Sequence, residues 1–372
     1  MTAGYGGGQF VVVGGGVIGC AIAYELARAG ERVTVLERGP LAREASYASA
    51  GIISSPSPRT GAFGLASFRR YPALIAEVED AAGMRVGWNR LGETQALLAG
   101  DDPRALQDLM EWQGAQGLHV EWLEGTALRE REPALSADIT MAIWERDAGS
   151  LRVHLLAQAL ARAAVTHGAS VREHIPVQRI ATDAGRRVTG VETAAGLVPA
   201  DCVVVAAGAW SRELGDLLGV TVPTMPVHGQ MYSVADPPVP LRSVIAGGGG
   251  YLVPRADGTV AVGATTDDFG YTKRVTPDGV ASLTDLVHRL APSLAAARLV
   301  ETWSGLRPGS ADGVPIIGPV PGHTGLWAAT GHYRGGALYA AATGEFVARA
   351  LRTGITDPIL APFAPARFGS GG

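Results

Sequence analysis

The stretch QFVVVGGGVIGCAIAYELARAGERVTVLERG, residues 9–39, decides the fold of this chain. A short apolar strand at residues 10–13 runs directly into a Gly-x-Gly-x-x-Gly turn. An amphipathic helix to about Arg28 follows, and a second strand, RVTVLE, ends in the acid Glu37. This order of elements predicts the βαβ unit of a dinucleotide-binding fold.

Each glycine of the turn has a mechanical task in such a fold. Gly14 allows the tight turn, Gly16 lets the backbone approach a pyrophosphate, and Gly19 lets helix and strand pack closely. Free N–H groups at the helix N-terminus attract the phosphates, and Glu37 stands where a carboxylate accepts hydrogen bonds from a ribose diol. A purely structural glycine turn is the alternative, but strand, helix and spaced acid together favour dinucleotide binding.

The fingerprint alone does not distinguish NAD from FAD. The segment REASYASAGIIS, residues 43–54, is small and polar and contains glycine where a second helix could start. Such a segment suits backbone and hydroxyl contacts along an extended cofactor. It suits a flexible surface loop equally well, so both interpretations stay open.

Composition limits the function classes. The 372 residues are 47% hydrophobic and 18% charged with a net charge of −4, which allows a large core over two domains. The absence of a basic run disfavours nucleic acid as a partner. Lys273 is the only lysine and no GxxxxGK[ST] loop occurs, which disfavours Schiff-base and P-loop chemistry. Cys20 and Cys202 lie far apart in apolar runs, so we expect core residues and neither a disulfide nor a metal site.

Residues 10–30 are the most apolar stretch near the N-terminus, but several glycines, Glu25 and Arg28 interrupt them. A membrane span requires a longer unbroken apolar run, and a signal peptide requires a basic leader. We therefore expect a cytoplasmic protein with no membrane partner.

The rest of the chain alternates helical and strand-like segments without an internal repeat. Helices are expected at residues 65–82, 103–116, 153–167, 278–290 and 334–352. The pattern departs from a simple doubly wound fold and predicts an α/β cofactor domain interleaved with a largely antiparallel α+β second domain. We expect the cofactor domain in residues 1–85, 150–220 and 300–372, and the second domain in residues 86–149 and 221–299.

Arg307 stands among glycines, prolines and aliphatic residues in WSGLRPGSADGVPIIG, residues 303–318. An arginine is always charged and seldom enters apolar surroundings without a partner. A ligand carboxylate or phosphate would pair with the Arg307 guanidinium through two parallel hydrogen bonds. An ion pair with Glu301 or Asp312, the nearest acids along the chain, is the structural alternative.

Four further motifs accompany the fingerprint, in order along the chain. They are VVVAAGAWS (203–211), YLVPRADG (251–258), GLRPGSADGVPIIG (305–318) and TGHYRGGALYAAATG (330–344). With them the chain resembles the FAD-dependent amine and D-amino-acid oxidase family, in particular the glycine oxidases of thiamin synthesis, over nearly its whole length. The resemblance implies FAD, a Rossmann-type FAD-binding domain, and a substrate domain whose sheet covers the flavin. Non-covalent FAD is expected because no cysteine lies near the C-terminal motifs.

The resemblance also implies site residues, position by position. The expected FAD contacts are Gly14, Gly15, Gly16, Val17, Ile18, Gly19, Glu37, Arg38, Ser46, Ala50, Gly51, Ile52, Val177, Ala207, Gly208, His332, Tyr333, Arg334, Gly335, Gly336, Ala337 and Leu338. Arg307 matches the arginine that binds the substrate carboxylate, Tyr251 a tyrosine that assists it, and Arg334 an arginine near the substrate. A core tyrosine is an equal alternative for Tyr251. His332 is expected to supply backbone and ring packing and not a catalytic base.

The implied reaction is oxidative deamination of glycine or another small amino acid, such as sarcosine or a short D-amino acid. Hydride passes to the flavin, water converts the imino acid to an oxo acid and ammonia, and molecular oxygen becomes hydrogen peroxide. A D-amino-acid or proline dehydrogenase that reduces a quinone or a partner protein is the nearest alternative. A non-catalytic flavin-binding subunit is a more distant one.

Two features depart from the family pattern. The glycine run at residues 247–250 precedes Tyr251 and predicts a roomier site or a looser loop. Lys273 lies in no motif that matches an oxygen-activating lysine. The preferred amino acid and the oligomeric state, a homo-oligomer included, stay open.

Overall fold

Residues 9–39 form the βαβ unit that their pattern predicts. In the computed structural model, which describes residues 4–217 and 222–369, β1 (Gln9–Val13), α1 (Val17–Arg28) and β2 (Arg32–Leu36) follow in that order. After its first residue β1 is buried throughout, as a central strand of a parallel sheet is. The glycine turn therefore lies between β1 and α1, where the sequence predicts it.

β1 lies inside a six-stranded sheet with the order β18-β19-β12-β1-β2-β8. Its strands pair in parallel except β18, which is antiparallel to β19. The remaining bounds in this sheet are β8 (Ser170–Arg172), β12 (Cys202–Val205), β18 (Ile316–Pro319) and β19 (Leu326–Thr330). Parallel neighbours need long crossover connections, so segments far apart in the chain meet here. Ligands bind beyond the carboxyl ends of such strands.

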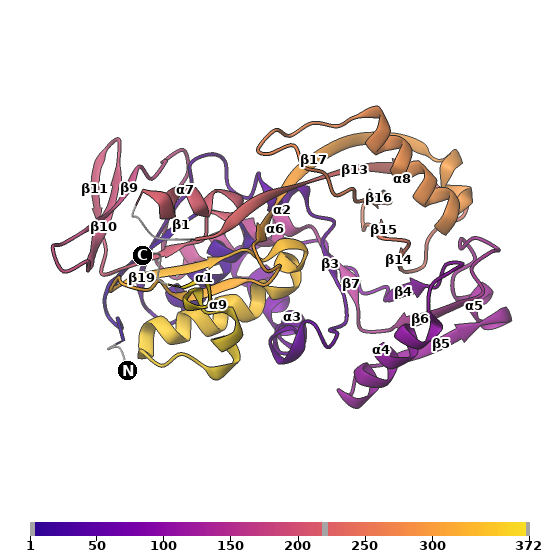
Figure 1. Cartoon of the computed structure of the whole chain (residues 1–372), viewed down its shortest axis with the longest axis horizontal. Helices are drawn as coiled ribbons and strands as arrows, with labels where there is room; N and C mark the ends of the chain where they lie inside the picture. Colours follow the sequence, from indigo (N-terminus) through magenta and orange to yellow (C-terminus); the bar gives the residue numbers. More distant parts are fainter. Residues whose placement is uncertain (1–3, 218–221, 370–372) are drawn as a thin grey trace.

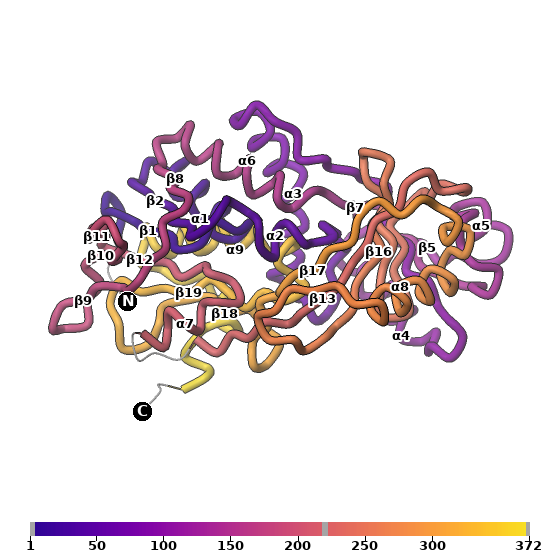
Figure 2. The backbone as a smooth tube through the Cα atoms, turned by 90° about the horizontal axis from the view of Figure 1, so that it is seen from above, coloured from indigo at the N-terminus to yellow at the C-terminus, as the bar shows by residue number. Residues whose placement is uncertain are grey.

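Along each strand of this sheet, side chains alternate between the two faces, and each face packs into a hydrophobic core of its own. One face packs against four helices that contact one another, α1, α3 (Gly61–Ala82), α6 (Val153–Thr166) and α9 (Gly336–Thr353) (Figure 2). The other face packs against a three-stranded sheet, β9 (Arg179–Thr182), β10 (Val188–Thr193) and β11 (Gly196–Pro199). Cys20 and Cys202 are free and buried in the helix-covered core, which confirms their prediction as core residues.

The second part of the molecule is an eight-stranded sheet, drawn on the right of Figure 1. Its order is β17 (Arg298–Ser310), β13 (Thr224–Ala235), β16 (Val260–Gly263), β15 (Gly250–Pro254), β14 (Val244–Gly247), β4 (Glu93–Ala96), β6 (Met141–Glu145) and β5 (Val120–Glu124). All neighbours are antiparallel except β14 and β4. Helix α8 (Pro277–Leu290) packs on this sheet through a core of its own. The predicted α/β fold with a largely antiparallel second part is confirmed.

The long pair β13 and β17 leads from the eight-stranded sheet towards the cofactor part (Figure 1). β17 pairs with β13 along its length, from Arg298 to Ser310. The expected domain boundary at residue 300 divides this strand. The domain bounds stay a prediction, and we propose that the second domain extends to Ser310.

The remaining elements lie outside the sheets and the large helices described above. They are α2 (Ala45–Ala48), β3 (Ile52–Ile53), α4 (Pro103–Ala115), α5 (Gly125–Arg131), β7 (Gly149–Ser150), η1 (Gly208–Trp210), α7 (Ser211–Asp216), η2 (Pro292–Ala296), η3 (Tyr333–Gly335), η4 (Pro358–Phe363) and η5 (Pro365–Phe368). One predicted helix, α3, starts earlier in the structure than its sequence pattern predicts. α3 begins at Gly61 and not at residue 65, because Phe63 is buried against the rings of Tyr339 and Phe363. Those rings come from the far end of the chain, so sequence periodicity could not reveal them.

Two buried glutamates lie side by side on adjacent strands of the eight-stranded sheet. Glu93 of β4 and Glu145 of β6 are register partners, and both are almost fully buried. Burial, with the neighbouring carboxyl as a second cause, raises the pKa of Glu93, and burial raises the pKa of Glu145. Glu145 also accepts a hydrogen bond from the backbone N–H of Ser55 at 3.1 Å, which joins this pair to the segment after β3.

This pair predicts a pH dependence of stability. Because the folded-state pKa values are raised, the folded protein binds more protons than the unfolded chain, and its stability falls as pH rises above the ordinary glutamate value. Glu93→Gln removes one charge and adds a donor for Glu145. We expect it to raise the free energy of unfolding by about 1–3 kcal/mol near pH 8 and to have little effect near pH 4.

Thermal unfolding followed by circular dichroism at both pH values measures this difference. Glu121→Gln on the exposed side of β5 is the matched control and should show no pH-dependent gain. An equal gain at both pH values would show that the effect is packing and not charge.

Candidate active site

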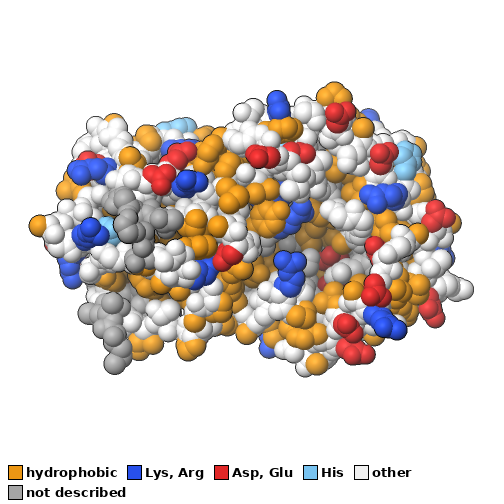
Figure 3. All heavy atoms as spheres, viewed as in Figure 1, with side chains coloured by type: hydrophobic (Ala, Val, Ile, Leu, Met, Phe, Trp, Pro, Cys, Tyr) orange, Lys and Arg blue, Asp and Glu red, His pale blue; other side chains and the backbone are white. Residues whose placement is uncertain are grey.

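A cavity of about 380 Å³ begins at the carboxyl ends of β1 and β2 and continues to β13 and β17. It thus connects the six-stranded sheet with the eight-stranded one. Figure 3 shows one face of the molecule, which is hollowed between these two parts. A cavity at the carboxyl edge of a parallel sheet is where the fold predicts a ligand.

The glycine turn forms one end of this cavity. Gly14 has a φ of +115°, and a side chain there would approach the Ala206 carbonyl oxygen to 2.4 Å. Only glycine fits both the conformation and the contact. Gly16 and Val17 line the cavity at the start of α1, whose first turn has no acidic residue and no side-chain cap bond to Gly16. The helix N-terminus therefore presents a partial positive charge to a ligand.

Glu37 is held beside the glycine turn by two backbone donors. Its carboxylate accepts from the N–H groups of Gly15 at 2.7 Å and Gly39 at 2.9 Å, and the side chain lines the cavity. Arg38 also lines the cavity, with its guanidinium 3.9 Å from the ring centroid of Trp210. Trp210 lies inside the 203–211 motif, but no local pattern there indicates this contact.

The segment of residues 43–54 could be a cofactor contact or a surface loop from its sequence alone. Its residues 43–52 line the cavity at every position except Tyr47, while Ile53 and Ser54 do not line it. Ser46 is buried and accepts from the Val17 N–H at 3.0 Å, which joins this segment to the start of α1. β3 then pairs with β7 and fixes the path of the chain. The surface-loop interpretation is therefore wrong for this segment.

Most of the expected cofactor residues meet around this one cavity. Those that line it are Gly14, Gly16, Val17, Ile18, Glu37, Arg38, Ser46, Ala50, Gly51, Ile52, Val177, Ala207, Gly208, His332, Tyr333, Arg334, Gly336 and Ala337. Gly15, Gly19, Gly335 and Leu338 do not line it; Gly19, for example, packs against the Gly14 carbonyl. Their individual roles stay predictions.

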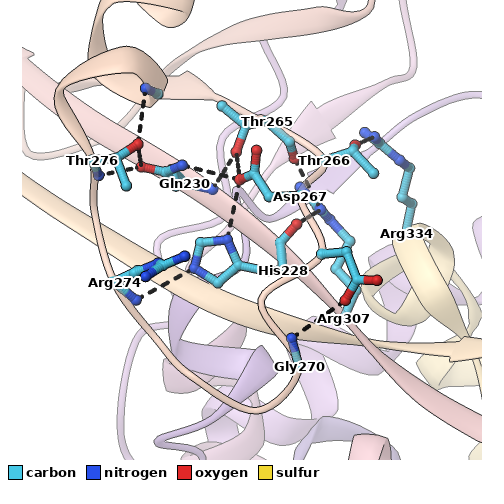
Figure 4. Close-up of polar contacts among 12 residues, drawn as sticks. His228, Gln230, Thr265, Thr266, Asp267, Gly270, Arg274, Thr276, Arg307 and Arg334 are labelled. Carbon is cyan, nitrogen blue, oxygen red and sulfur yellow. Dashed lines mark hydrogen bonds and ion pairs between the residues drawn. The ribbon is translucent and has the colours of Figure 1, made fainter.

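Arg307 lies at the other end of the cavity, on β17. Its Nη1 donates to the backbone carbonyls of His228 at 3.3 Å and Thr265 at 3.1 Å (Figure 4). Within residues 4–217 and 222–369, no carboxylate oxygen lies within 4.0 Å of its guanidinium. Burial, and to a smaller degree the charge of Arg334, lowers the pKa of Arg307, as expected for a cation without an anion.

Neither acid proposed as the structural partner of Arg307 is used in that way. Asp312 pairs with Arg367 at 2.7 Å, and Glu301 is exposed, opposite Ser233 in the sheet. The ion-pair alternative for Arg307 is therefore wrong. A half-buried guanidinium that faces a cavity without a protein carboxylate is suited to a ligand anion.

Tyr251, Arg334 and His332 surround the same end of the cavity. Tyr251 is half-buried in β15, where its ring packs on Gly263, and its hydroxyl is near enough to raise the pKa of Arg307 against the effect of burial. Arg334 is exposed and donates to Thr266 Oγ1 at 2.6 Å. Burial lowers the pKa of His332 to about 3, so its ring is neutral, 3.1 Å from the Thr343 hydroxyl.

The glycine run at residues 247–250 does not line the cavity. It forms the hairpin turn between β14 and β15, with Gly248 and Gly249 at φ values of +56° and +82°. Two successive positive φ values are what the commonest two-residue hairpin turn requires. Gly250 packs closely against Leu286 of α8, so the run adds neither room to the site nor a loose loop.

The model of one protein family, described as DAO, FAD dependent oxidoreductase, matches residues 9–350. The chain belongs to this family. It is 40% identical to the glycine oxidase of Pseudomonas aeruginosa, over 96% of this chain and 98% of that protein. It is 37% identical to the glycine oxidase of Pseudomonas putida over the same shares. The crystal structure of glycine oxidase from Geobacillus kaustophilus superposes with a TM-score of 0.89 at 33% identity, covering 97% and 98% of the two chains.

Membership makes the protein an FAD-dependent oxidoreductase, and the cavity fits that cofactor. The close approach at Gly14 suits a pyrophosphate, as does the N-terminus of α1, which has no acidic residue in its first turn. Glu37 lines the cavity where such a fold would place a ribose, and a second helix start, that of α9, also lines the cavity. Such an N-terminus would stabilise the negative charge of a reduced flavin.

Every helix among the described residues is too short or too polar to cross a membrane.

Proposed function

We propose that this protein oxidises glycine or another small amino acid to the corresponding oxo acid and ammonia, with FAD as cofactor and oxygen as electron acceptor. The observation that carries the proposal is Arg307, a half-buried guanidinium at the end of the FAD-family cavity that has no carboxylate partner in the part of the chain that the structure describes. The two relatives named as glycine oxidases, similar over almost their whole length, support the same substrate class.

The hydrogen bonds of Arg307 leave one edge of its guanidinium for the substrate. Because both protons of Nη1 are used by the carbonyls of His228 and Thr265, the edge formed by Nε and Nη2 is free to take a carboxylate through two parallel bonds. Tyr251 of β15, which lies in the same sheet beyond β13 and β16, supplies one further donor. These contacts hold the amino acid by its carboxylate and so restrict the direction of its Cα–H bond.

FAD, when bound, accepts the hydride from Cα and transfers the electrons to oxygen, which yields hydrogen peroxide. The amino acid enters with a neutral amine and leaves as an imino acid, which water hydrolyses to the oxo acid and ammonia. No protein base is assigned, because the neutral ring of His332 is buried next to Thr343. In this proposal positioning by Arg307 and Tyr251 is the main contribution of the chain's own side chains.

A dehydrogenase is the rival function. The L-proline dehydrogenase of P. horikoshii superposes with a TM-score of 0.88, but its 22% identity supports a common fold alone. The decisive experiment is anaerobic reduction of the holoenzyme by glycine, sarcosine, short D-amino acids or proline, followed by mixing with air-saturated buffer. Rapid reoxidation with one peroxide per flavin supports the proposal. Slow reoxidation that a quinone analogue accelerates would establish the dehydrogenase instead.

Tyr251→Phe tests the assisting role of the tyrosine. The ring keeps its packing on Gly263, while one hydrogen bond from the neutral hydroxyl to the charged substrate carboxylate is lost. We expect KM for the amino acid to rise by the equivalent of about 1.5–3 kcal/mol, with kcat little changed. Steady-state peroxide release measures both constants. An unchanged KM would identify Tyr251 as a packing residue.

Non-covalent attachment, the cytoplasmic location, the thiamin-synthesis role and the oligomeric state stay predictions. Both cysteines lie away from the lining of the cavity, which supports non-covalent FAD. Acid precipitation separates the cases, because non-covalent FAD remains in the supernatant and a covalent flavin precipitates with the protein.

A further inference from the structure

Asp267 lies at the centre of a polar network behind the carboxylate site (Figure 4). Its Oδ2 accepts three hydrogen bonds, from His228 Nδ1 at 3.1 Å, Gln230 Nε2 at 3.0 Å and Thr265 Oγ1 at 2.5 Å. Burial by itself would raise the pKa of Asp267, but these bonds outweigh it and lower the pKa. The carboxylate is therefore ionised at neutral pH, and its Oδ2 takes all three of these bonds.

The donors to Asp267 come from the segments that carry the two carbonyls bound by Arg307. His228 and Gln230 belong to β13, and Thr265 lies just after β16. Backbone bonds in both directions join His228 with Asp267, at 3.2 and 3.0 Å. The Gln230 N–H also donates to Thr265 Oγ1 at 2.9 Å. Asp267 thus ties together the segments that present the His228 and Thr265 carbonyls to Arg307.

One tautomer of the His228 ring satisfies this network. Its side chain is buried, and its Nε2 accepts from the Arg274 N–H at 3.4 Å. The ring proton is therefore on Nδ1, which donates to Asp267. A neutral histidine oriented in this way needs an acceptor at Nδ1, and Asp267 provides it.

The position of the Arg307 guanidinium also depends on the path of the β13 backbone. It rests against Gly229, where a side chain carbon would come within 2.4 Å of Nη2 and 2.6 Å of Cζ. A small movement of β13 at His228 or Gly229 would therefore displace the guanidinium, because it is in contact with the strand and bound to its carbonyl. The position of the arginine therefore depends on the backbone of β13, which pairs with β17 and is also bonded through two of its side chains to Asp267.

We propose that Asp267 is a positioning residue for carboxylate binding: by fixing the His228 and Thr265 carbonyls it holds Arg307 with its free edge towards the cavity. This inference rests on the proposed role of Arg307 in binding the substrate carboxylate. Asp267 itself does not line the cavity. Its effect on substrate binding passes through the arginine.

The test uses acetate, a minimal carboxylate, and the change that it causes in the flavin absorbance of the holoenzyme. Asp267→Ala should raise the acetate dissociation constant and KM for glycine by about tenfold or more, with FAD content retained. In an Arg307→Ala background the same substitution should add nothing, since Asp267 acts through that arginine. Asp267→Asn keeps an acceptor oxygen and should recover part of the affinity.

Asp268→Ala is the matched control, because this neighbouring exposed acid bonds only with the Gly270 N–H among the described contacts. Normal acetate binding by Asp267→Ala, or a loss that adds fully to that of Arg307→Ala, would overturn the inference. If Asp267→Ala does not retain FAD, Thr265→Val carries the same test, because it keeps the Thr265 carbonyl and removes the hydroxyl that donates to Asp267 and accepts from the Gln230 N–H. Failure of acetate to bind even the unaltered holoenzyme would instead contradict the proposed function.

Discussion

Arg307→Ala is expected to abolish most of the activity while the protein folds and binds FAD normally. The substitution removes the only charged group proposed to hold the substrate carboxylate, and we expect kcat/KM to fall by the equivalent of about 2–5 kcal/mol. FAD should stay bound, since the glycine turn and Glu37 line the cavity at the carboxyl ends of β1 and β2, whereas Arg307 lies on β17. Peroxide release and the flavin-to-protein absorbance ratio measure the two effects separately.

Two further variants sharpen this result. Arg307→Lys should restore little activity, because an ammonium is a point charge without the planar fork that binds a carboxylate through two bonds. Arg298→Ala is the matched control on the same strand, since Arg298 is exposed and pairs with Asp236 at the surface. If Arg307→Ala loses FAD or unfolds, the arginine is structural.

Glu37→Ala should weaken FAD binding without unfolding the protein. The carboxylate is preorganised by the N–H groups of Gly15 and Gly39 and lines the cavity where the fold places a ribose. Loss of charged hydrogen bonds to the ribose should lower the free energy of FAD binding by about 1–3 kcal/mol. Fluorescence quenching during titration of the apoprotein with FAD measures this change.

The matched controls for Glu37 separate charge from position. Glu37→Gln keeps the shape and an acceptor, so it should lose less affinity than Glu37→Ala. Glu192→Ala changes an exposed glutamate of β10 that pairs with Arg179, away from the cavity, and should leave FAD affinity unchanged. Equal affinity of Glu37→Ala and the unaltered protein would remove Glu37 from the ribose site.

Segments whose structure is decided by their own residues were predictable from the sequence. The unit β1-α1-β2 is one of them, because its apolar periods, its glycines and the acid at Glu37 all lie within residues 9–39. The burial of Cys20 and Cys202 follows in the same way from the apolar runs around them. The motif of residues 330–344 likewise predicted a glycine-rich turn and a helix, which are η3 and α9.

Features that depend on distant segments were not predictable in this way. The role of residues 43–54 stayed open because their path is set by β7 and by the Val17 N–H, which lie elsewhere in the chain. The glycines before Tyr251 suggested a roomier site, whereas pairing of β14 with β15 turns them into a tight hairpin beside α8. Trp210 and Asp267 have no local signal, since their importance comes only from their neighbours in space.

The sequence by itself determined that the chain has a dinucleotide-binding βαβ unit and an arginine, Arg307, without an obvious partner. Tertiary structure decided what surrounds that arginine. Glu301 and Asp312 are close along the chain but face elsewhere, whereas the carbonyls that hold Arg307 come from His228 and Thr265, far away in sequence. Strand pairing brings such groups together through backbone hydrogen bonds, which any residue can form, and this leaves no trace in the local pattern of side chains.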